Sequence, residues 1–183
     1  IDLNKDILIL RKVKSLWSGI NRDPKLEKFI EELDANKVLK NSHLIIFTES
    51  KETAKYLFED IELIYPGKVI CYDGSSSAAE KQKVINNFDA KVSKPENEFR
   101  ILIATEVLAE GVNLHRSNIV VNYDTPWNAT KLIQRIGRVN RIGTKADRIH
   151  VYNFFPTSNV EDDIRLEQKA FLKLQSFHEA LGE

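Results

Sequence analysis

The sequence predicts a three-layer α/β domain, in which helices cover both faces of a mainly parallel central sheet. Five short, nearly continuous apolar runs alternate with segments whose apolar residues recur at helical spacing. Continuous apolar runs are typical of parallel strands that are buried on both faces, and the alternation favours right-handed crossovers through helices. We expect the strands at 43–47, 68–72, 100–104, 118–123 and 149–154.

Length and composition fit one globular domain. The chain has 183 residues, of which 42% are hydrophobic and 30% are charged, enough for a core of its own. Lys plus Arg equals Asp plus Glu at 27 each, so binding to nucleic acid would need a local basic patch. The single Cys71 excludes an internal disulfide, and no apolar run is long enough to cross a bilayer. We therefore expect a cytoplasmic protein without a membrane partner.

The start of the chain points to a fragment. It contains no methionine and begins at Ile1, so we expect it to be a piece of a longer protein. We divide it into an N-terminal connecting segment at 1–22, one α/β domain at 23–156, and an amphipathic tail helix at 157–183 packed on that domain.

Two helices are expected before the first strand. The segment 4–20 has apolar residues at helical spacing, although 7–10 also fits a short strand. Asp23 followed by Pro24 predicts an N-cap and the first residue of a second helix. That helix presents one apolar stripe, made of Leu26, Phe29, Ile30 and Leu33.

A polar turn and a helix follow most of the strands. Ser77 and Glu80 are spaced as a capping box, and Asn128 is placed to cap the helix that begins after it. Between Asp89 and Glu98 lies a polar insertion that contains a proline. We interpret it as a mobile surface loop rather than a site.

Polar residues cluster after the strands, at the carboxyl ends where ligands gather in sheets of this kind. Seven of them should lie along one edge of the domain: Thr48, Gly74, Ser75, Thr105, Glu106, Gly111 and Gln134. Hydroxyls and free N–H groups at helix starts suit a phosphate, but they also cap helices without any ligand. Spacing alone leaves both interpretations open.

Gln134, Arg138 and Arg141 should share one face of the helix after Asn128. Two guanidinium groups aimed together repel each other unless an anion lies between them, and a phosphate matches their planar fork. A solvated charged face is the simpler interpretation of an isolated Arg-x-x-Arg pair.

Other catalytic groups are missing. The sequence has no Gly-x-x-x-x-Gly-Lys-Ser/Thr loop, so it has no standard phosphate cradle and no hydroxyl to hold Mg²⁺. The four histidines lack metal-ligand spacing, so we predict no metal site. We expect no ATP hydrolysis by this domain alone.

The order of these segments resembles the C-terminal RecA-like lobe of superfamily-two helicases and translocases. His43-Leu-Ile-Ile-Phe-Thr resembles motif IV, and Asp73-Gly-Ser resembles the loop that comes next. Ala104-Thr-Glu through Glu110-Gly-Val-Asn-Leu resembles motif V. Gln134-Arg-Ile-Gly-Arg-Val-Asn-Arg resembles motif VI.

Within that superfamily, the segment 121–128 is most similar to the Swi/Snf-like group, especially its RapA-like members. Three residues depart from related patterns. Thr144 stands where Swi/Snf-like members often have Gln, Glu106 where RNA helicases usually have Asp, and Glu110 where remodellers have a small residue.

The resemblance implies the C-terminal lobe of an ATP-dependent DNA helicase or translocase. Arg138 and Arg141 would be arginine fingers that reach the γ-phosphate of ATP, held with Mg²⁺ on an N-terminal lobe of the same polypeptide. Gln134, Gly111 and Asn113 would bind nucleotide. Phosphates of one nucleic-acid strand would contact Thr48, Gly74, Ser75 and Thr105. An RNA helicase lobe and a non-catalytic RecA-like binding module remain alternatives.

Overall fold

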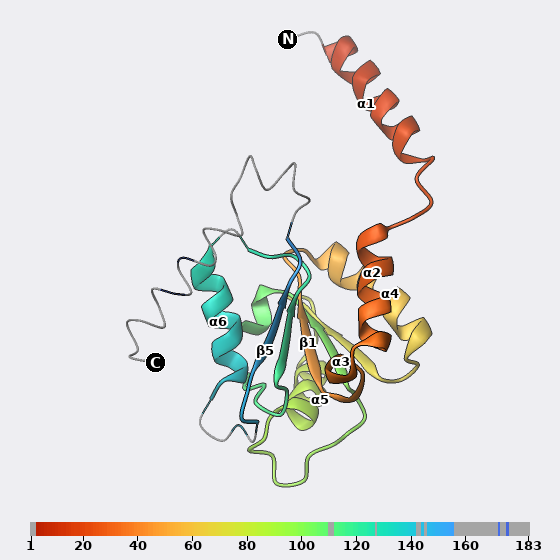
Figure 1. Ribbon diagram of the computed structural model, residues 1–183. Helices are drawn as coiled ribbons and strands as arrows, with labels where there is room; N and C mark the ends of the chain where they lie inside the picture. Colours follow the sequence, from red (N-terminus) through yellow and green to blue (C-terminus); the bar gives the residue numbers. More distant parts are fainter. Residues whose placement is uncertain are drawn as a thin grey trace. The chain divides into compact units, whose positions relative to one another are not determined.

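The computed structural model describes residues 3–109, 112–126, 128–141, 144, 146–155, 172 and 175 (Figure 1). The chain divides into two compact units, Ile1–Asn36 and Lys37–Glu183. The boundary between them falls after the second helix, whereas the sequence places a boundary at 22/23. The predicted division into a connecting segment and a domain therefore stays a prediction.

The first unit contains two helices. Helix α1 (Leu3–Trp17) confirms helix rather than strand for this segment, and none of its residues is buried. Helix α2 (Pro24–Ala35) begins as predicted, because the Asp23 carboxylate accepts hydrogen bonds from the backbone N–H groups of Lys25 and Leu26, both at 3.0 Å. Its buried residues are Leu26, Phe29 and Leu33.

The second unit is built on a five-stranded sheet in which every pairing is parallel. The spatial order of the strands is β2-β3-β1-β4-β5. Each strand has four residues: β1 (Leu44–Phe47), β2 (Val69–Tyr72), β3 (Ile101–Ala104), β4 (Ile119–Asn122) and β5 (His150–Asn153). The predicted runs are one or two residues longer than these strands.

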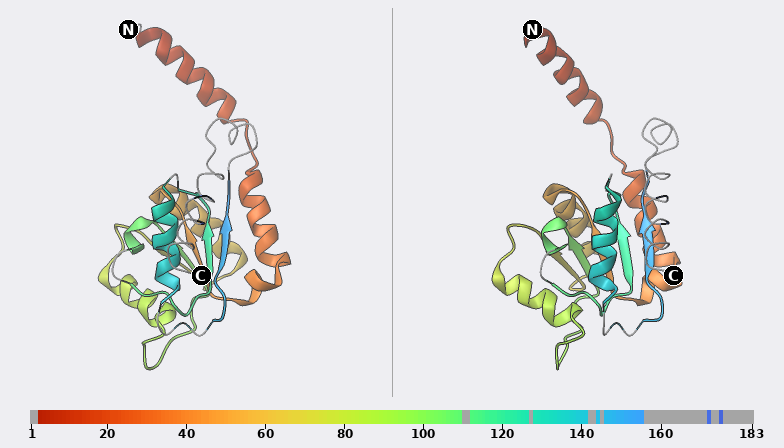
Figure 2. Two further views of the ribbon diagram at one scale, coloured as in Figure 1. Left: turned by 60° about the vertical axis from the view of Figure 1, so that its left-hand side comes forward. Right: turned by 90° about the vertical axis from the view of Figure 1, so that its left-hand side faces the viewer.

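Helices cover both faces of this sheet, as predicted. Helix α4 (Lys51–Ile64) lies on one side and α6 (Ala129–Val139) on the other (Figure 1). Helix α5 (Ala78–Phe88) shares the side of α6 (Figure 2), since Val84, Phe88 and Val139 belong to one core cluster with Ile45 and Leu102. The short α3 (Lys37–Asn41) and η1 (Glu106–Ala109) complete the described elements.

Helix caps fix where the strand-end loops stop. Ser50 caps α4, and Ser77 with Glu80 forms the predicted capping box at α5. Asn128 caps α6 by accepting a hydrogen bond from the Thr130 N–H at 3.0 Å. These caps place the loops between them at the carboxyl edge of the sheet.

The predicted tail helix at 157–183 lies outside the described residues, except for Leu172 and Gln175, which are helical. Within the described part of the chain, no helix has the length and apolar character that a membrane span requires.

Candidate nucleotide and nucleic-acid site at the carboxyl edge of the sheet

A hollow of about 390 Å³ opens where strands β1, β2 and β3 end. Three predicted site residues, Gly74, Ser75 and Thr105, line it together. The remaining lining residues are Glu49, Lys51, Glu106 and Val107. The topology thus brings together residues from three loops, as expected for the carboxyl ends of parallel strands.

The Ser75 loop is pre-formed by its own hydrogen bonds. The Asp73 carboxylate accepts from both the Ser75 N–H and the Ser75 hydroxyl, each at 2.6 Å. These bonds, chiefly the one from the hydroxyl, lower the pKa of Asp73. The Lys51 ammonium donates to the Ser75 hydroxyl at 2.8 Å and brings a positive charge into the hollow. Sequence reasoning did not single out Lys51, although it follows the Ser50 cap directly.

Thr48 is placed differently from the other three residues. It is fully buried, and its hydroxyl donates to the Asp124 carboxylate at 2.5 Å. The same carboxylate accepts from the Glu49 N–H at 3.3 Å. Thr48 therefore holds the loop after β1 against the loop after β4. This placement leaves no exposed surface of Thr48 for the predicted phosphate contact.

Arg135 is the centre of the site, and the sequence prediction omitted it. Its side chain has no exposed surface, yet its guanidinium binds groups from three strand ends. Nε donates to Glu106 at 2.9 Å, Nη2 to Glu49 at 3.1 Å and again to Glu106. Nη1 donates to the Asn122 side chain at 2.8 Å and to the Asp124 carbonyl at 3.1 Å.

The surroundings of Arg135 explain why a full charge is tolerated in the interior. Two carboxylates and two neutral oxygens satisfy the guanidinium, and the Phe47 ring lies 5.1 Å from its central carbon. Glu49 also pairs with Lys131 at 3.1 Å, which adds a second link between α6 and the loop after β1. Arg135 thereby fixes α6 on the sheet edge.

A signal for Arg135 was present in the sequence. Leu132, Arg135 and Val139 recur at helical spacing, and all three are buried. A charge on the apolar stripe of a helix needs a buried partner, and acidic residues follow four of the predicted strands. The pattern thus marks Arg135 as unusual, but it does not show which acids it meets.

The prediction that Arg141 shares a helical face with Arg138 is wrong. Helix α6 ends at Val139, and Asn140 is its C-cap. Beyond the helix, the Thr144 hydroxyl donates to the Val139 carbonyl at 2.9 Å, and the Thr144 N–H donates to the Arg141 carbonyl. Arg141 therefore lies in the loop that follows the helix.

Arg141 is instead held by another predicted site residue. Its guanidinium donates to the side-chain oxygen of Asn113 and, at 3.4 Å, to the Gly137 carbonyl. Asn113 in turn donates to Asp89 at 3.4 Å. Two segments predicted to bind nucleotide are thus joined directly, with the Arg141 side chain exposed at the surface.

Gln134 and Arg138, two further predicted contacts with ATP, lie on α6. Gln134 is exposed and Arg138 is half-buried on that helix. Gly111 lies outside the described residues. Among the residues that the structure describes, no group of three or more His, Cys, Asp or Glu side chains is arranged to hold a metal ion.

Comparison with known proteins identifies the family to which this architecture belongs. The family described as "Helicase conserved C-terminal domain" matches residues 24–143. The chain belongs to this helicase family. Its fold is the RecA-like α/β fold predicted from the motifs, and a solved structure of S. cerevisiae Dbp5 bound to RNA and ADP BeF3 matches it with a TM-score of 0.60. That match has 27% sequence identity and covers 80% of this chain and 36% of the Dbp5 chain.

Several relatives of this helicase C-terminal domain are named as ATP-dependent helicases. An uncharacterized ATP-dependent helicase, YqhH of Bacillus subtilis, is 32% identical over 93% of this chain and 28% of its own length. DEAD-box ATP-dependent RNA helicase 15 of Arabidopsis thaliana is 33% identical over 70% of this chain and 27% of its own length. The chain thus spans about a quarter of these relatives. The C-terminal part of the Fun30 ATPase domain shares the fold, with a TM-score of 0.62 and 19% identity.

Proposed function

We propose that this domain is the C-terminal lobe of an ATP-dependent DNA helicase or translocase of the Swi/Snf-like group. Arg138 and Arg141 act as arginine fingers toward ATP, which an N-terminal lobe of the same polypeptide holds with Mg²⁺. The observation that carries the proposal is the joining of Asn113 and Arg141 at the end of α6. An arginine held by a neutral amide keeps its charge available for an anion.

The remaining donors of Arg141 suit a phosphate. Nε and Nη1 each have one partner, whereas Nη2 has none among the described residues. The side chain is also exposed. A guanidinium in this state stabilises negative charge that develops on a transferring phosphoryl group. Gln134, on the exposed side of α6, would orient the nucleotide, together with Asn113 and Gly111.

The hollow at the strand ends is the proposed contact with one nucleic-acid strand. Gly74, Ser75 and Thr105 line it, and Lys51 supplies a positive charge beside Ser75. These groups fit backbone phosphates rather than bases, so binding would be insensitive to sequence. Thr48 would support this surface indirectly, by holding Asp124. Closure of the two lobes around ATP and their reopening would step the protein along its strand.

RNA is the second candidate substrate. DEAD-box RNA helicases are among the relatives, and the matching Dbp5 structure contains RNA. Phosphate contacts do not separate the two nucleic acids, whereas the resemblance of 121–128 to the Swi/Snf-like group favours DNA. Measuring ATP turnover by the full-length protein with single-stranded DNA, double-stranded DNA or RNA of equal length decides between them. Strongest stimulation by RNA would overturn the DNA assignment.

The finger role is tested by Arg138→Ala in the full-length protein. Loss of an arginine finger should lower the rate of ATP turnover about a thousandfold or more, while nucleic-acid binding changes little. Arg148→Ala, which removes an exposed arginine before β5, is the matched control and should leave turnover unchanged. A normal rate in Arg138→Ala removes this residue from the finger role. Undetectable turnover in the unaltered full-length protein would favour the non-catalytic binding module.

A further inference from the structure

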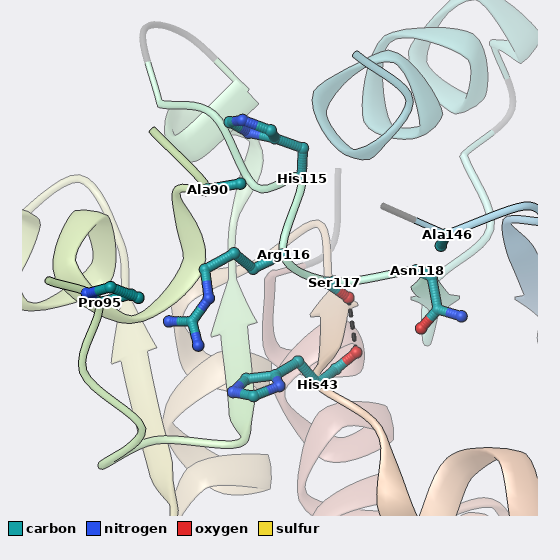
Figure 3. A pocket seen from close by; sticks show the side chains of 8 residues that line it. All are labelled: His43, Ala90, Pro95, His115, Arg116, Ser117, Asn118 and Ala146. Carbon is teal, nitrogen blue, oxygen red and sulfur yellow. Dashed lines mark hydrogen bonds between the residues drawn. The ribbon is translucent and has the colours of Figure 1, made fainter. Parts of the chain in front are cut away.

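A second cavity, of about 480 Å³, lies at the opposite edge of the sheet (Figure 3). His43 directly precedes β1, and Ser117 and Asn118 directly precede β4, so the cavity adjoins the amino ends of these strands. A strand of four residues spans roughly 13 Å, which separates this cavity from the carboxyl edge. Its lining residues are His43, Ala90, Pro95, His115, Arg116, Ser117, Asn118 and Ala146.

The lining contains a guanidinium and no carboxylate. Arg116 is half-buried, and burial lowers the pKa of its guanidinium. Nη1 donates to the carbonyls of Asn87 at 2.5 Å and Glu96 at 2.6 Å, and Nη2 donates to the side-chain oxygen of Asn97 at 2.5 Å. All three partners are neutral. Two of the five N–H groups have no partner among the described residues.

The His43 ring lies beside the Arg116 guanidinium, and its nitrogens have no hydrogen-bond partner in the described part of the chain (Figure 3). The Asn118 amide also lines the cavity, but it lies on the far side of the Ser117 hydroxyl and points away from both (Figure 3). Burial, with added repulsion from Arg116 and Arg100, lowers the pKa of His43. The His115 ring is turned away from this group (Figure 3). The Arg116 guanidinium and the neutral His43 ring thus lie side by side in the wall of the cavity.

A purely structural role accounts for only part of this arrangement. Arg116 ties the 89–98 loop to the sheet, which accounts for its three hydrogen bonds but not for the empty space or for a lining without an acid. Glu49 and Glu106 neutralise the fully buried guanidinium of Arg135, whereas that of the half-buried Arg100 is held by two carbonyls and the Tyr65 ring. Arg116 differs from Arg100 because it lines a cavity, where an anion would compensate its charge.

We propose that this amino-edge cavity binds a compact oxyanion, either a carboxylate or a phosphate monoester, through Arg116 with His43 as a neutral partner. The ligand is compact because the cavity offers one charged residue, whereas a nucleic-acid strand is held by several cations along its track. The volume leaves room for atoms beyond the oxyanion. Ala90, Pro95 and Ala146 form an apolar part of the wall against which those atoms would pack.

Titration of the ¹⁵N-labelled 183-residue chain, followed by NMR, tests the proposal. Inorganic phosphate and acetate are the two probes, and chloride at equal ionic strength is the reference. We expect saturable shifts at the Asn118 side-chain amide and the His43 ring with at least one probe, and the stronger probe identifies the preferred oxyanion. An absence of saturable shifts at both groups with both probes overturns the proposal.

Three variants show whether the anion occupies this cavity. Arg116→Gln should weaken binding at least about tenfold, the equivalent of one charge-assisted hydrogen bond. Ala146→Phe keeps all the Arg116 hydrogen bonds but fills the cavity, so it should also abolish the shifts. Arg148→Gln removes a nearby exposed arginine that does not line the cavity and should bind normally. Unchanged affinity in Ala146→Phe, with a native spectrum, contradicts the cavity as the site.

The proposal is independent of the helicase assignment. Arg138→Ala combined with Arg141→Ala should leave the shifts at His43 and Asn118 intact, because neither arginine lines the cavity. Loss of those shifts in the double variant would place the anion at the fingers instead, and would overturn the amino-edge site while leaving the proposed function standing.

Discussion

Arg135 is a fully buried cation that pairs with two carboxylates, those of Glu49 and Glu106. A buried ion pair contributes to stability only when its geometry satisfies both partners, since desolvation of each charge opposes the attraction between them. Here four acceptor groups surround one guanidinium, and they come from the last residue of β4 and from the segments after β1, β3 and β4. The main effect of Arg135 is therefore to fix the orientation of α6 on the edge of the sheet.

Replacing Arg135 should test that role through stability. Arg135→Ala leaves Glu49 and Glu106 without their cation, and removing one partner of a buried pair costs several kcal/mol. Both carboxylates are partly exposed and regain water, so we expect a loss near the low end of that range, about 3 kcal/mol. Urea unfolding of the chain measures it, with Arg148→Ala as a control that should stay within about 0.5 kcal/mol of the parent. A loss below about 1 kcal/mol would contradict the orienting role of this ion pair.

His43 should make stability depend on pH. Its pKa in the folded chain is lowered below the ordinary value of 6.5, mainly by burial and then by the charges of Arg116 and Arg100. The unfolded chain therefore binds the proton more readily. The stability contributed by neutral His43 is complete above pH 6.5 and is lost as the pH falls from there toward the folded pKa.

The measurement compares urea midpoints at about pH 7.5 and about pH 5.5. His43→Gln cannot titrate, so its midpoint should fall less between the two pH values than that of the parent chain. If the urea midpoint of the variant falls as much as that of the parent, or more, groups other than His43 cause the loss of stability at low pH.

At the scale of elements, α6 carries a glycine that no contact with the described residues requires. Gly137 is exposed in the interior of the helix, and a Cβ atom there would meet nothing within 4 Å. Glycine at such a position costs roughly 1 kcal/mol relative to alanine. The position lies between Arg135 and Arg138, and its carbonyl accepts from Arg141. We infer that the space above Gly137 is used by the nucleotide or by the opposing lobe.

Gly137→Ala should therefore separate stability from activity. In the isolated chain it should raise the free energy of unfolding by about 0.5–1 kcal/mol, because alanine favours the helix. In the full-length protein it should lower ATP turnover, because the added methyl group obstructs close approach. Thr130→Ala, an exposed substitution in the first turn of the same helix, should leave turnover unchanged. An unchanged rate of ATP turnover in Gly137→Ala would contradict the inferred close approach at this position.

The elements differ in how far the sequence predicts them, and the reason is the range of the interactions involved. Strands such as β1 and β3 are continuous apolar runs, and the caps at Ser77 and Asn128 act within three residues, so local pattern suffices. Just after α6, the Val139 carbonyl accepts from a hydroxyl five residues further along the chain, a contact that the local pattern does not reveal. Arg135 needs partners 29 and 86 residues away, which only the strand order brings together.

The same reasoning applies to the site residues. Gly74, Ser75 and Thr105 were predictable because carboxyl ends of parallel strands always share an edge. Sequence pattern could not show that Thr48 is turned inward toward Asp124, or that Asn113 holds Arg141. Those contacts depend on side-chain directions that are settled only when the loops pack.

At the scale of the whole molecule, Arg138 and Arg141 occur in a chain whose sequence has no loop of its own to bind the phosphates of ATP. The sequence lacks a phosphate-cradling loop, and the chain spans 28% of the length of its Bacillus subtilis relative. Under the proposed function, hydrolysis is a property of two lobes. Each arginine then acts on a phosphate that the other lobe positions, and closure of the lobes assembles the site.

The 183-residue chain alone should accordingly show no ATP turnover above background, with or without nucleic acid. The full-length protein should turn over ATP, and its Arg138→Ala variant should fall back toward the rate of the isolated chain, because a finger supplies about a thousandfold or more of the rate. A phosphate-release assay on all three proteins at equal concentration makes the comparison. As a control, circular dichroism should be used to check that the isolated chain is folded. Its inactivity would then reflect the missing lobe. Turnover by the folded isolated chain at the full-length rate would refute the shared active site.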